Sequence, residues 1–166
     1  ILKSITQSEI INNNYDKALS GLKKIYKQTN DKQLKSRSSF ISAQIYSELN
    51  KIDSAKAFFS KTINSGINKS SEIYLRSKLK IMSLSDGYKT EDYQKLIKSE
   101  RYPDKEALIL YYEALSYLKN NPDKAAHIFK KSLTLNDEDK LLKLKTYSKL
   151  LDINYNKSNY LIASTY

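Results

Sequence analysis

The apolar residues of this chain recur every three or four positions, which is the spacing of one face of an α-helix. The clearest stretch runs from residue 40 to residue 63, and a polar joint at Asn50 and Lys51 divides it. Before the joint, Ala43 and Tyr46 lie one helical turn apart. After it, apolar residues follow at the same spacing, at Ile52, Ala55, Phe59 and Ile63. The stretch predicts two helices that cross at small residues, where their axes can approach closely.

Similar helical faces recur on both sides of this stretch. They are formed by Tyr15, Ala18, Leu22 and Ile25, by Leu75, Leu79 and Met82, by Tyr93 and Leu96, and by Leu141, Leu144, Tyr147 and Leu151. Gly66 is predicted to end a helix in the left-handed conformation, and Gly21 indicates either a close helix contact or a mildly weakened helix. With three Gly and two Pro, the chain lacks the turn residues of a strand-rich fold.

A pair of positions recurs at the start of each predicted second helix, where a bulky residue is followed three positions later by a small or apolar one. The pairs are Tyr15/Ala18, Ile52/Ala55, Tyr93/Leu96, Pro122/Ala125 and Tyr160/Ala163. Ala125, Phe129 and Ser132 also repeat the order of Ala55, Phe59 and Thr62. The spacing averages about 36 residues, close to the period of about 34 in tetratricopeptide repeats. The chain therefore resembles the tetratricopeptide repeat (TPR) family, with Asn14, Asn50 and Asn121 where that family usually has Gly.

This resemblance implies an all-α fold, a right-handed α-solenoid of antiparallel helix pairs with about five TPR-like repeats. The approximate units are 1–28, 31–65, 70–100, 103–135 and 137–166, and they are expected to form a single helical-repeat domain within a longer chain. Because each helix pair buries its apolar face only against its neighbours, the array is expected to be one curved body. The resemblance places the first helix of each pair on the concave side.

The concave side is predicted to hold a partner-binding groove, because the first helices pack with one face and leave the other free. The free faces supply the groove residues Arg37, Phe40, Gln44, Arg76, Lys80, Leu108, Tyr111, Leu115 and Lys145, and they also carry Gln7, Ile10 and Ile73. A basic and aromatic strip with an apolar centre suits an extended or helical polypeptide with acidic groups. Tyr111 and Leu115 have an alternative role as core residues, or as a surface covered by a dimer mate or an appended domain.

The net charge of +11 raises nucleic acid or an anionic membrane as a partner. Of the 29 basic residues, however, only Arg37, Arg76 and Arg101 are arginines. Arginine is the residue that forms bidentate hydrogen bonds with phosphates and bases. A solvated Lys-rich surface is therefore the favoured interpretation. Nucleic-acid binding through that surface is kept as an alternative function.

Residues that carry catalysis or hold metals are scarce. The chain has no Cys, and its one His, His127, has no patterned Ser or Cys partner. Asp137, Glu138 and Asp139 form an acidic cluster, but no calcium-loop Gly or terminal Glu follows them, so they are interpreted as favourable charges at a helix N-terminus. Gly occurs only at positions 21, 66 and 87, which leaves no phosphate-binding loop. The sequence predicts a protein that is not an enzyme and has no cofactor and no metal.

The leading interpretation is a non-catalytic scaffold that binds a protein or peptide segment in its groove. An alternative is a bacterial cell-envelope adaptor, periplasmic or lipid-anchored, resembling the TPR lipoproteins of outer-membrane assembly. The chain begins at Ile1 without Met, so a removed signal segment is compatible with the sequence. A periplasmic or cell-envelope location is favoured over a cytoplasmic one. No run approaches the roughly 18 apolar residues of a membrane span.

Overall fold

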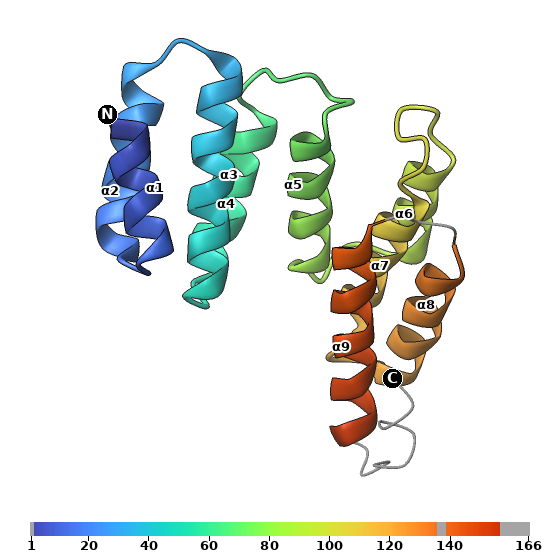
Figure 1. The fold of residues 1–166 in the computed structure, drawn as a ribbon. Coiled ribbons are helices and arrows are strands. Elements are labelled where there is room, and N and C mark those ends of the chain that lie inside the picture. Colours follow the sequence, from blue (N-terminus) through green and yellow to red (C-terminus); the bar gives the residue numbers. More distant parts are fainter. Residues whose placement is uncertain (1, 136–138, 157–166) are drawn as a thin grey trace. The chain divides into compact units, whose positions relative to one another are not determined.

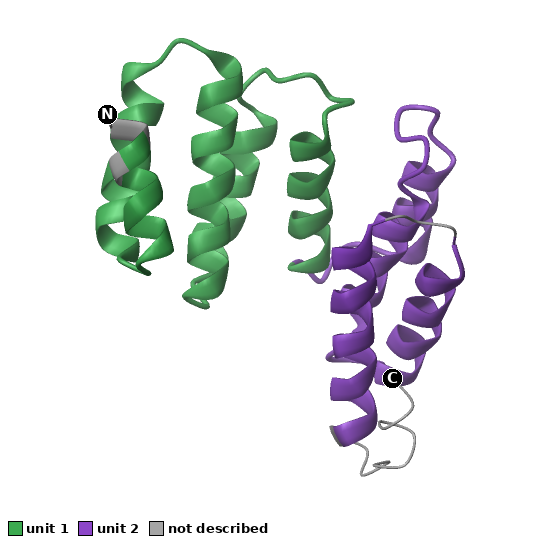
Figure 2. Cartoon of the chain, viewed as in Figure 1, with its two compact units in different colours: residues 1–84 green, residues 85–166 purple. Residues whose placement is uncertain are grey.

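The structure of the protein is a computed structural model that describes residues 2–135 and 139–156, and their side chains except those of residues 2, 3, 5 and 156. Within these ranges the chain folds into nine α-helices and no strand, so the predicted all-α class is confirmed (Figure 1). The chain divides into two compact units, residues 1–84 and 85–166, which we call unit 1 and unit 2 (Figure 2).

Five helices build unit 1, and each packs against the next along the chain. They are α1 (Leu2–Ile11), α2 (Tyr15–Gln28), α3 (Lys32–Glu48), α4 (Ile52–Ile63) and α5 (Glu72–Ser83). α3 also contacts α5, so the first helices of two successive pairs lie side by side. α3 therefore has three neighbours, α2, α4 and α5, and it forms the centre of unit 1.

The crossing of α3 and α4 is built from the small and aromatic residues that the sequence pattern identified. Ala43, Ala55 and Phe59 are fully buried, and the Phe40 ring meets the Phe59 ring edge-on at a centroid distance of 5.8 Å. α3 also carries buried serines whose hydroxyls donate to backbone carbonyls of the preceding turn; Ser42 Oγ, for example, lies 2.8 Å from the Ser38 carbonyl oxygen. Such small side chains with satisfied hydroxyls let the neighbouring helices approach α3 closely.

Four helices build unit 2, and α7 packs against both α6 and α8. The four helices are α6 (Thr90–Ile97), α7 (Glu106–Tyr117), α8 (Pro122–Thr134) and α9 (Lys140–Asn156). Ala125, Phe129 and Ser132 of α8 are buried, as are Ala55, Phe59 and Thr62 of α4, so the two helices use corresponding positions for packing. Ser132 Oγ donates to the Ala107 carbonyl oxygen at 2.9 Å, which ties α8 to α7 with a buried hydrogen bond.

Asparagines supply the left-handed residues at two joints between paired helices. Asn13 and Asn50 have φ values of 58° and 54°, a region that favours Gly and that Asn tolerates better than most residues. At the first joint the left-handed residue is thus Asn13 rather than Asn14. Asn121 is not left-handed and instead caps α8, where its side chain accepts from the Lys124 N–H at 3.0 Å. Gly66 is left-handed as predicted, with φ of 78°.

α9 packs with a different face from the one predicted. The sequence pattern assigned Leu141, Leu144 and Tyr147 to the core, but their side chains are 59%, 66% and 39% exposed. The buried face instead carries Leu142, Thr146, Leu150 and Ile153. The prediction was wrong because leucines at positions 141, 142, 144, 150 and 151 complete two opposite helical faces, and spacing alone does not decide between them.

The boundary between the units falls inside the predicted third helix pair, 70–100, since α5 belongs to unit 1 and α6 to unit 2. The predicted tenth helix, with Tyr160 and Ala163, lies outside the described residues, as do Asp137 and Glu138. In the part that the structure describes, no helix combines the length and the apolar character needed to cross a lipid bilayer.

Candidate functional site

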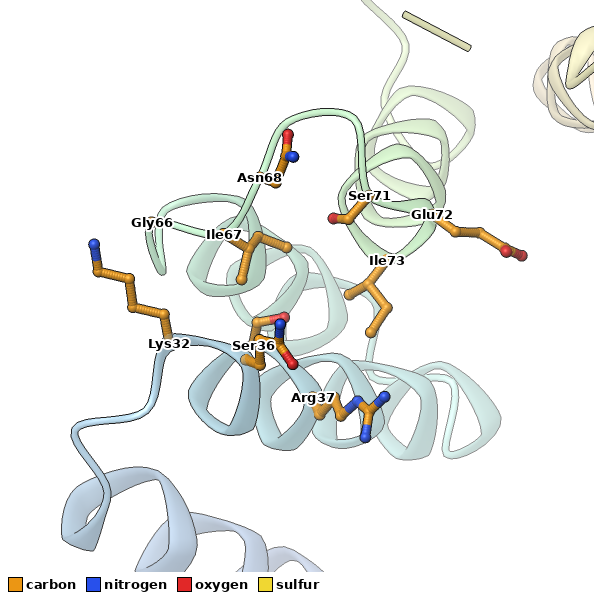
Figure 3. A pocket seen from close by; sticks show the side chains of 10 residues that line it. Lys32, Ser36, Arg37, Gly66, Ile67, Asn68, Ser71, Glu72 and Ile73 are labelled. Atoms are coloured by element: carbon orange, nitrogen blue, oxygen red, sulfur yellow. The ribbon is translucent and has the colours of Figure 1, made fainter. Parts of the chain in front are cut away.

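The first helices of unit 1 border two hollows, and the larger one lies between α3 and α5. This hollow, which we call the loop-side hollow, has a volume of about 470 Å³. α3 lines it with Lys32, Gln33, Ser36 and Arg37, the α4–α5 loop with Gly66, Ile67, Asn68 and the cap residue Ser71, and α5 with Glu72 and Ile73. In Figure 3, Ile67 and Ile73 point toward α3, whereas the Glu72 carboxylate points away from the hollow.

Local hydrogen bonds hold the rim of the loop-side hollow. The Asn68 side-chain oxygen accepts from the Ser70 N–H at 2.8 Å, and Ser71 caps α5 by accepting from the Tyr74 N–H. Across the hollow, the Asp31 carboxylate caps α3 by accepting from the Gln33 and Leu34 N–H groups. These caps satisfy free backbone donors at both helix starts and so fix the walls of the hollow.

A smaller hollow, which we call the apolar hollow, lies on the other side of α3. Its volume is about 200 Å³. The residues that line it come from α1, α2 and α3: Thr6, Gln7, Ile10, Leu22, Ile25, Leu34, Arg37, Ser38 and Ile41. Arg37 lines both hollows, so its side chain stands where the two meet over α3.

The two units differ strongly in charge. Unit 1 has 15 Lys and Arg residues against six Asp and Glu, a net charge of +9, whereas unit 2 has 14 against 12, a net charge of +2. Around the loop-side hollow, Glu72 is bound to Arg76 at 2.6 Å. Neither Lys32 nor Arg37 has a carboxylate partner among the residues that the structure describes. The hollows of unit 1 are therefore in a positive surface with two uncompensated cations.

The predicted groove residues of unit 1 divide between this surface and the core. Arg37 and Gln44 are exposed, and Arg37 lines the hollows. Phe40 is half-buried against Phe59, so its ring contributes to packing. Arg76 and Lys80 are partly buried on α5, and neither lines a hollow named above.

The predicted groove residues of unit 2 are less accessible. Leu108 and Tyr111 are 3% and 8% exposed, and the Tyr111 ring lies 5.6 Å from the Phe129 ring, centroid to centroid. Burial raises the pKa of Tyr111 to about 12. We therefore assign these two side chains to the packing of unit 2. Leu115 is half-buried and Lys145 is exposed.

A partly buried polar cluster joins α6, α7 and α8 in unit 2. Glu113 of α7 is 2% exposed, and burial raises the pKa of its carboxyl above the usual range. Nearby, Thr90 Oγ1 lies 2.9 Å from Tyr117 Oη and accepts from Lys124 Nζ at 3.3 Å. The Lys124 ammonium also lies 3.8 Å from the centroid of the Tyr117 ring. The cluster links three helices through their side chains, and we assign it to the stability of unit 2.

Sequence reasoning found part of the wall of each hollow and missed the rest. Gln7, Ile10, Arg37 and Ile73 were placed on the free faces of first helices, and all four line a hollow. The loop residues Ile67 and Asn68 were missed because a loop has no periodicity; the left-handed Gly66 was the one signal that the chain reverses there. Glu113 was missed because a single acid in an apolar helix gives no sign of its burial.

Catalytic and metal-binding constellations were also sought. His127 is exposed on α8. Within the described ranges, no group of three or more His, Asp or Glu side chains could hold a metal ion. In comparisons with known proteins, no protein-family model matches the chain, and neither a curated protein sequence nor a solved structure matches it significantly.

Proposed function

We propose that the protein is a non-catalytic scaffold that binds a segment of another polypeptide across the first helices of unit 1. The observation that carries this proposal is the pair of hollows on either side of α3, with the exposed Arg37 side chain between them. Both hollows combine aliphatic walls with polar or charged groups. That combination is typical of sites that bury the side chains of a bound peptide.

The proposal can be tested without knowing the natural partner. A phage-displayed library of random peptides is selected against the full chain, and the Kd of each recovered peptide is measured by fluorescence anisotropy. Because a few well-packed contacts dominate such interfaces, we expect Ile10→Ala or Ile73→Ala to weaken binding by about tenfold. Lys23→Ala, on the exposed surface of α2, serves as the control and should leave the Kd unchanged. Peptides that bind the Ile10→Ala and Ile73→Ala variants with unchanged Kd would count against the proposal.

A second candidate function is nucleic-acid binding, which the net charge of +9 on unit 1 favours. A protein that binds through phosphates loses affinity steeply and linearly on a log–log plot as salt rises. Titration of single- and double-stranded DNA at about 50 mM and 200 mM salt distinguishes this candidate. Binding that survives in the Ile73→Ala variant but falls by orders of magnitude with salt would favour it over the polypeptide scaffold.

A further inference from the structure

We infer that the polypeptide bound by unit 1 is extended and acidic. Two of its apolar side chains lie three positions apart, and a residue between them carries a carboxylate. This inference rests on the proposed function and specifies its ligand. It follows from the chemistry of the two hollows, from the position of Arg37 and from the distance across α3.

Each hollow offers an aliphatic surface to a ligand. Ile10 and Ile41 line the apolar hollow, and Ile67 and Ile73 line the loop-side hollow. All four side chains are half-buried, so each keeps apolar surface that a ligand could cover. Covering such surface with an aliphatic or aromatic side chain removes apolar area from water, at about 25 cal/mol per Å². The hollows therefore favour one apolar anchor each.

Arg37 determines the charge of the group that lies between the anchors. Its side chain is exposed and lines both hollows, and it has no carboxylate partner in the described part of the chain. Lys32 adds a second cation at the start of α3, and the one acid of the loop-side hollow, Glu72, is engaged by Arg76. A guanidinium binds a carboxylate with two parallel hydrogen bonds, which Asp or Glu of a ligand can supply.

The width of α3 sets the separation of the two anchors. The hollows lie on either side of this helix, and an α-helix with its side chains is about 10–12 Å across, so the anchors must be separated by about 10 Å. An extended chain in the polyproline II conformation has three residues per turn and advances about 3.1 Å per residue, so side chains three positions apart lie on the same side of the chain and are separated by about 9 Å. The expected ligand thus has the order apolar–x–x–apolar, with Asp or Glu at one of the two middle positions.

The same features disfavour a nucleic acid as the ligand of these hollows. Single-stranded nucleic acids bind through aromatic side chains on which their bases stack. The side chains that line the two hollows include no aromatic ring. Aliphatic walls around a guanidinium suit a peptide with mixed apolar and acidic side chains.

The test uses the full chain and the peptides recovered from the random library. We expect these peptides to share an acidic residue between two apolar residues three positions apart. Arg37→Glu should weaken binding by about tenfold or more, and Arg37→Gln by less, because reversal adds repulsion to the loss of attraction. Replacing the peptide's acidic residue with Lys should restore binding to the Arg37→Glu variant. Lys24→Glu, an exposed charge reversal on α2 that lines neither hollow, is the matched control.

The outcomes separate this inference from the proposed function. Peptides that need Ile10 and Ile73 but carry no acidic residue, and that bind the Arg37→Glu variant normally, would overturn the acidic ligand and leave the scaffold function intact. Apolar residues recurring about seven positions apart would indicate a helical ligand, because a helix rises about 1.5 Å per residue, and would overturn the extended form. Equal weakening by Arg37→Glu and Lys24→Glu would show general charge attraction and would also overturn the inference.

Discussion

Asn50 holds the joint between α3 and α4 with a φ of 54°, which costs most side chains about 1–2 kcal/mol. Asn reduces this cost because its short polar side chain can hydrogen-bond locally, and Gly avoids it altogether. The side chain is exposed, so substitutions act mainly through the backbone. We therefore expect Asn50→Ala to lower the free energy of unfolding by about 1 kcal/mol and Asn50→Gly to leave it within about 0.5 kcal/mol.

Urea denaturation followed by circular dichroism measures both variants. Asn12→Ala provides the control, because Asn12 is exposed at a joint and is absent from the residues with positive φ. Equal stabilities for Asn50→Ala and Asn50→Gly would show that the left-handed conformation is not what constrains this position.

Glu113 is a residue whose burial makes stability depend on pH. Burial is the largest cause of its raised pKa, and Glu91 adds to it, while Thr90, Lys124 and Lys131 act in the opposite direction. The folded protein therefore resists ionisation that the unfolded chain undergoes near pH 4.5, the ordinary pKa of a Glu carboxyl. Stability from this group is full below that pH and is lost as the pH rises through the folded-state pKa.

We expect Glu113→Gln to remove this loss, since an amide keeps similar size and hydrogen-bonding groups without ionising. The stability difference between Glu113→Gln and the unchanged protein should shift in favour of the variant as the pH rises from about 4.5 to 8. Urea midpoints measured at intervals across that range provide the test. Glu100→Gln is the control, because Glu100 is exposed and is not among the groups that shift the pKa of Glu113. A difference that stays constant with pH would contradict the prediction.

At the scale of helices, Gly21 permits the close crossing of α1 and α2. A Cβ at this position would fall well inside van der Waals contact with Thr6 Oγ1, and Thr6 is itself buried. Two effects oppose each other when Gly21 becomes Ala. The helix gains about 1 kcal/mol from the better helix former, whereas overpacking a buried contact costs about 1–3 kcal/mol.

We expect the cost of overpacking to exceed the gain in helix propensity, so Gly21→Ala should lower the free energy of unfolding by about 1 kcal/mol. In a Thr6→Ala background the hydroxyl and methyl that it meets are gone, and the same substitution should become stabilising. A double-mutant cycle measured by urea denaturation checks this reversal of sign. Additive effects of the two substitutions would show that α1 and α2 do not meet at this contact.

The sequence predicted the helices well wherever one apolar face was unambiguous. Ala55, Phe59 and Thr62 lie at positions that only one face of α4 can bury, and all three are fully buried. α9 was assigned to the wrong face because adjacent leucines, such as Leu141 and Leu142, satisfy the helical period in two registers. Which register is buried depends on the neighbouring helix, and local spacing does not contain that information.

The candidate site was predictable only where it lies on helices. Arg37 and Ile73 were found because each occupies the face of a first helix opposite to its packing face. Ile67 lies in the α4–α5 loop, and its place in the wall of the loop-side hollow depends on how that loop crosses between the two helices. The hollow is thus a tertiary feature, formed by segments about 30 residues apart, and periodicity within one segment does not predict it.

At the scale of the whole chain, each of the two units has buried apolar side chains of its own. In unit 1, α5 contributes the buried Leu75, Leu79 and Met82, and in unit 2, α6 contributes the buried Tyr93 and Leu96. The segment between these helices is polar and includes Gly87, around which an added Cβ would meet nothing within 4 Å. Residues 85 to 88 belong to neither helix. Such a segment is the kind of site where proteases cut folded proteins.

We therefore expect limited chymotrypsin digestion to make its first cut between the units after Tyr88, whose side chain is 41% exposed. The fragment that ends there retains α1 to α5 with their core, and it should keep its helical circular dichroism after purification. Tyr88→Ser removes the cleavage site and should slow this cut without changing the unfolding midpoint. A first cut inside the α3–α4 or α7–α8 pair would contradict the division into units. Loss of helix from the isolated fragment would show that the core of unit 1 needs unit 2 to fold.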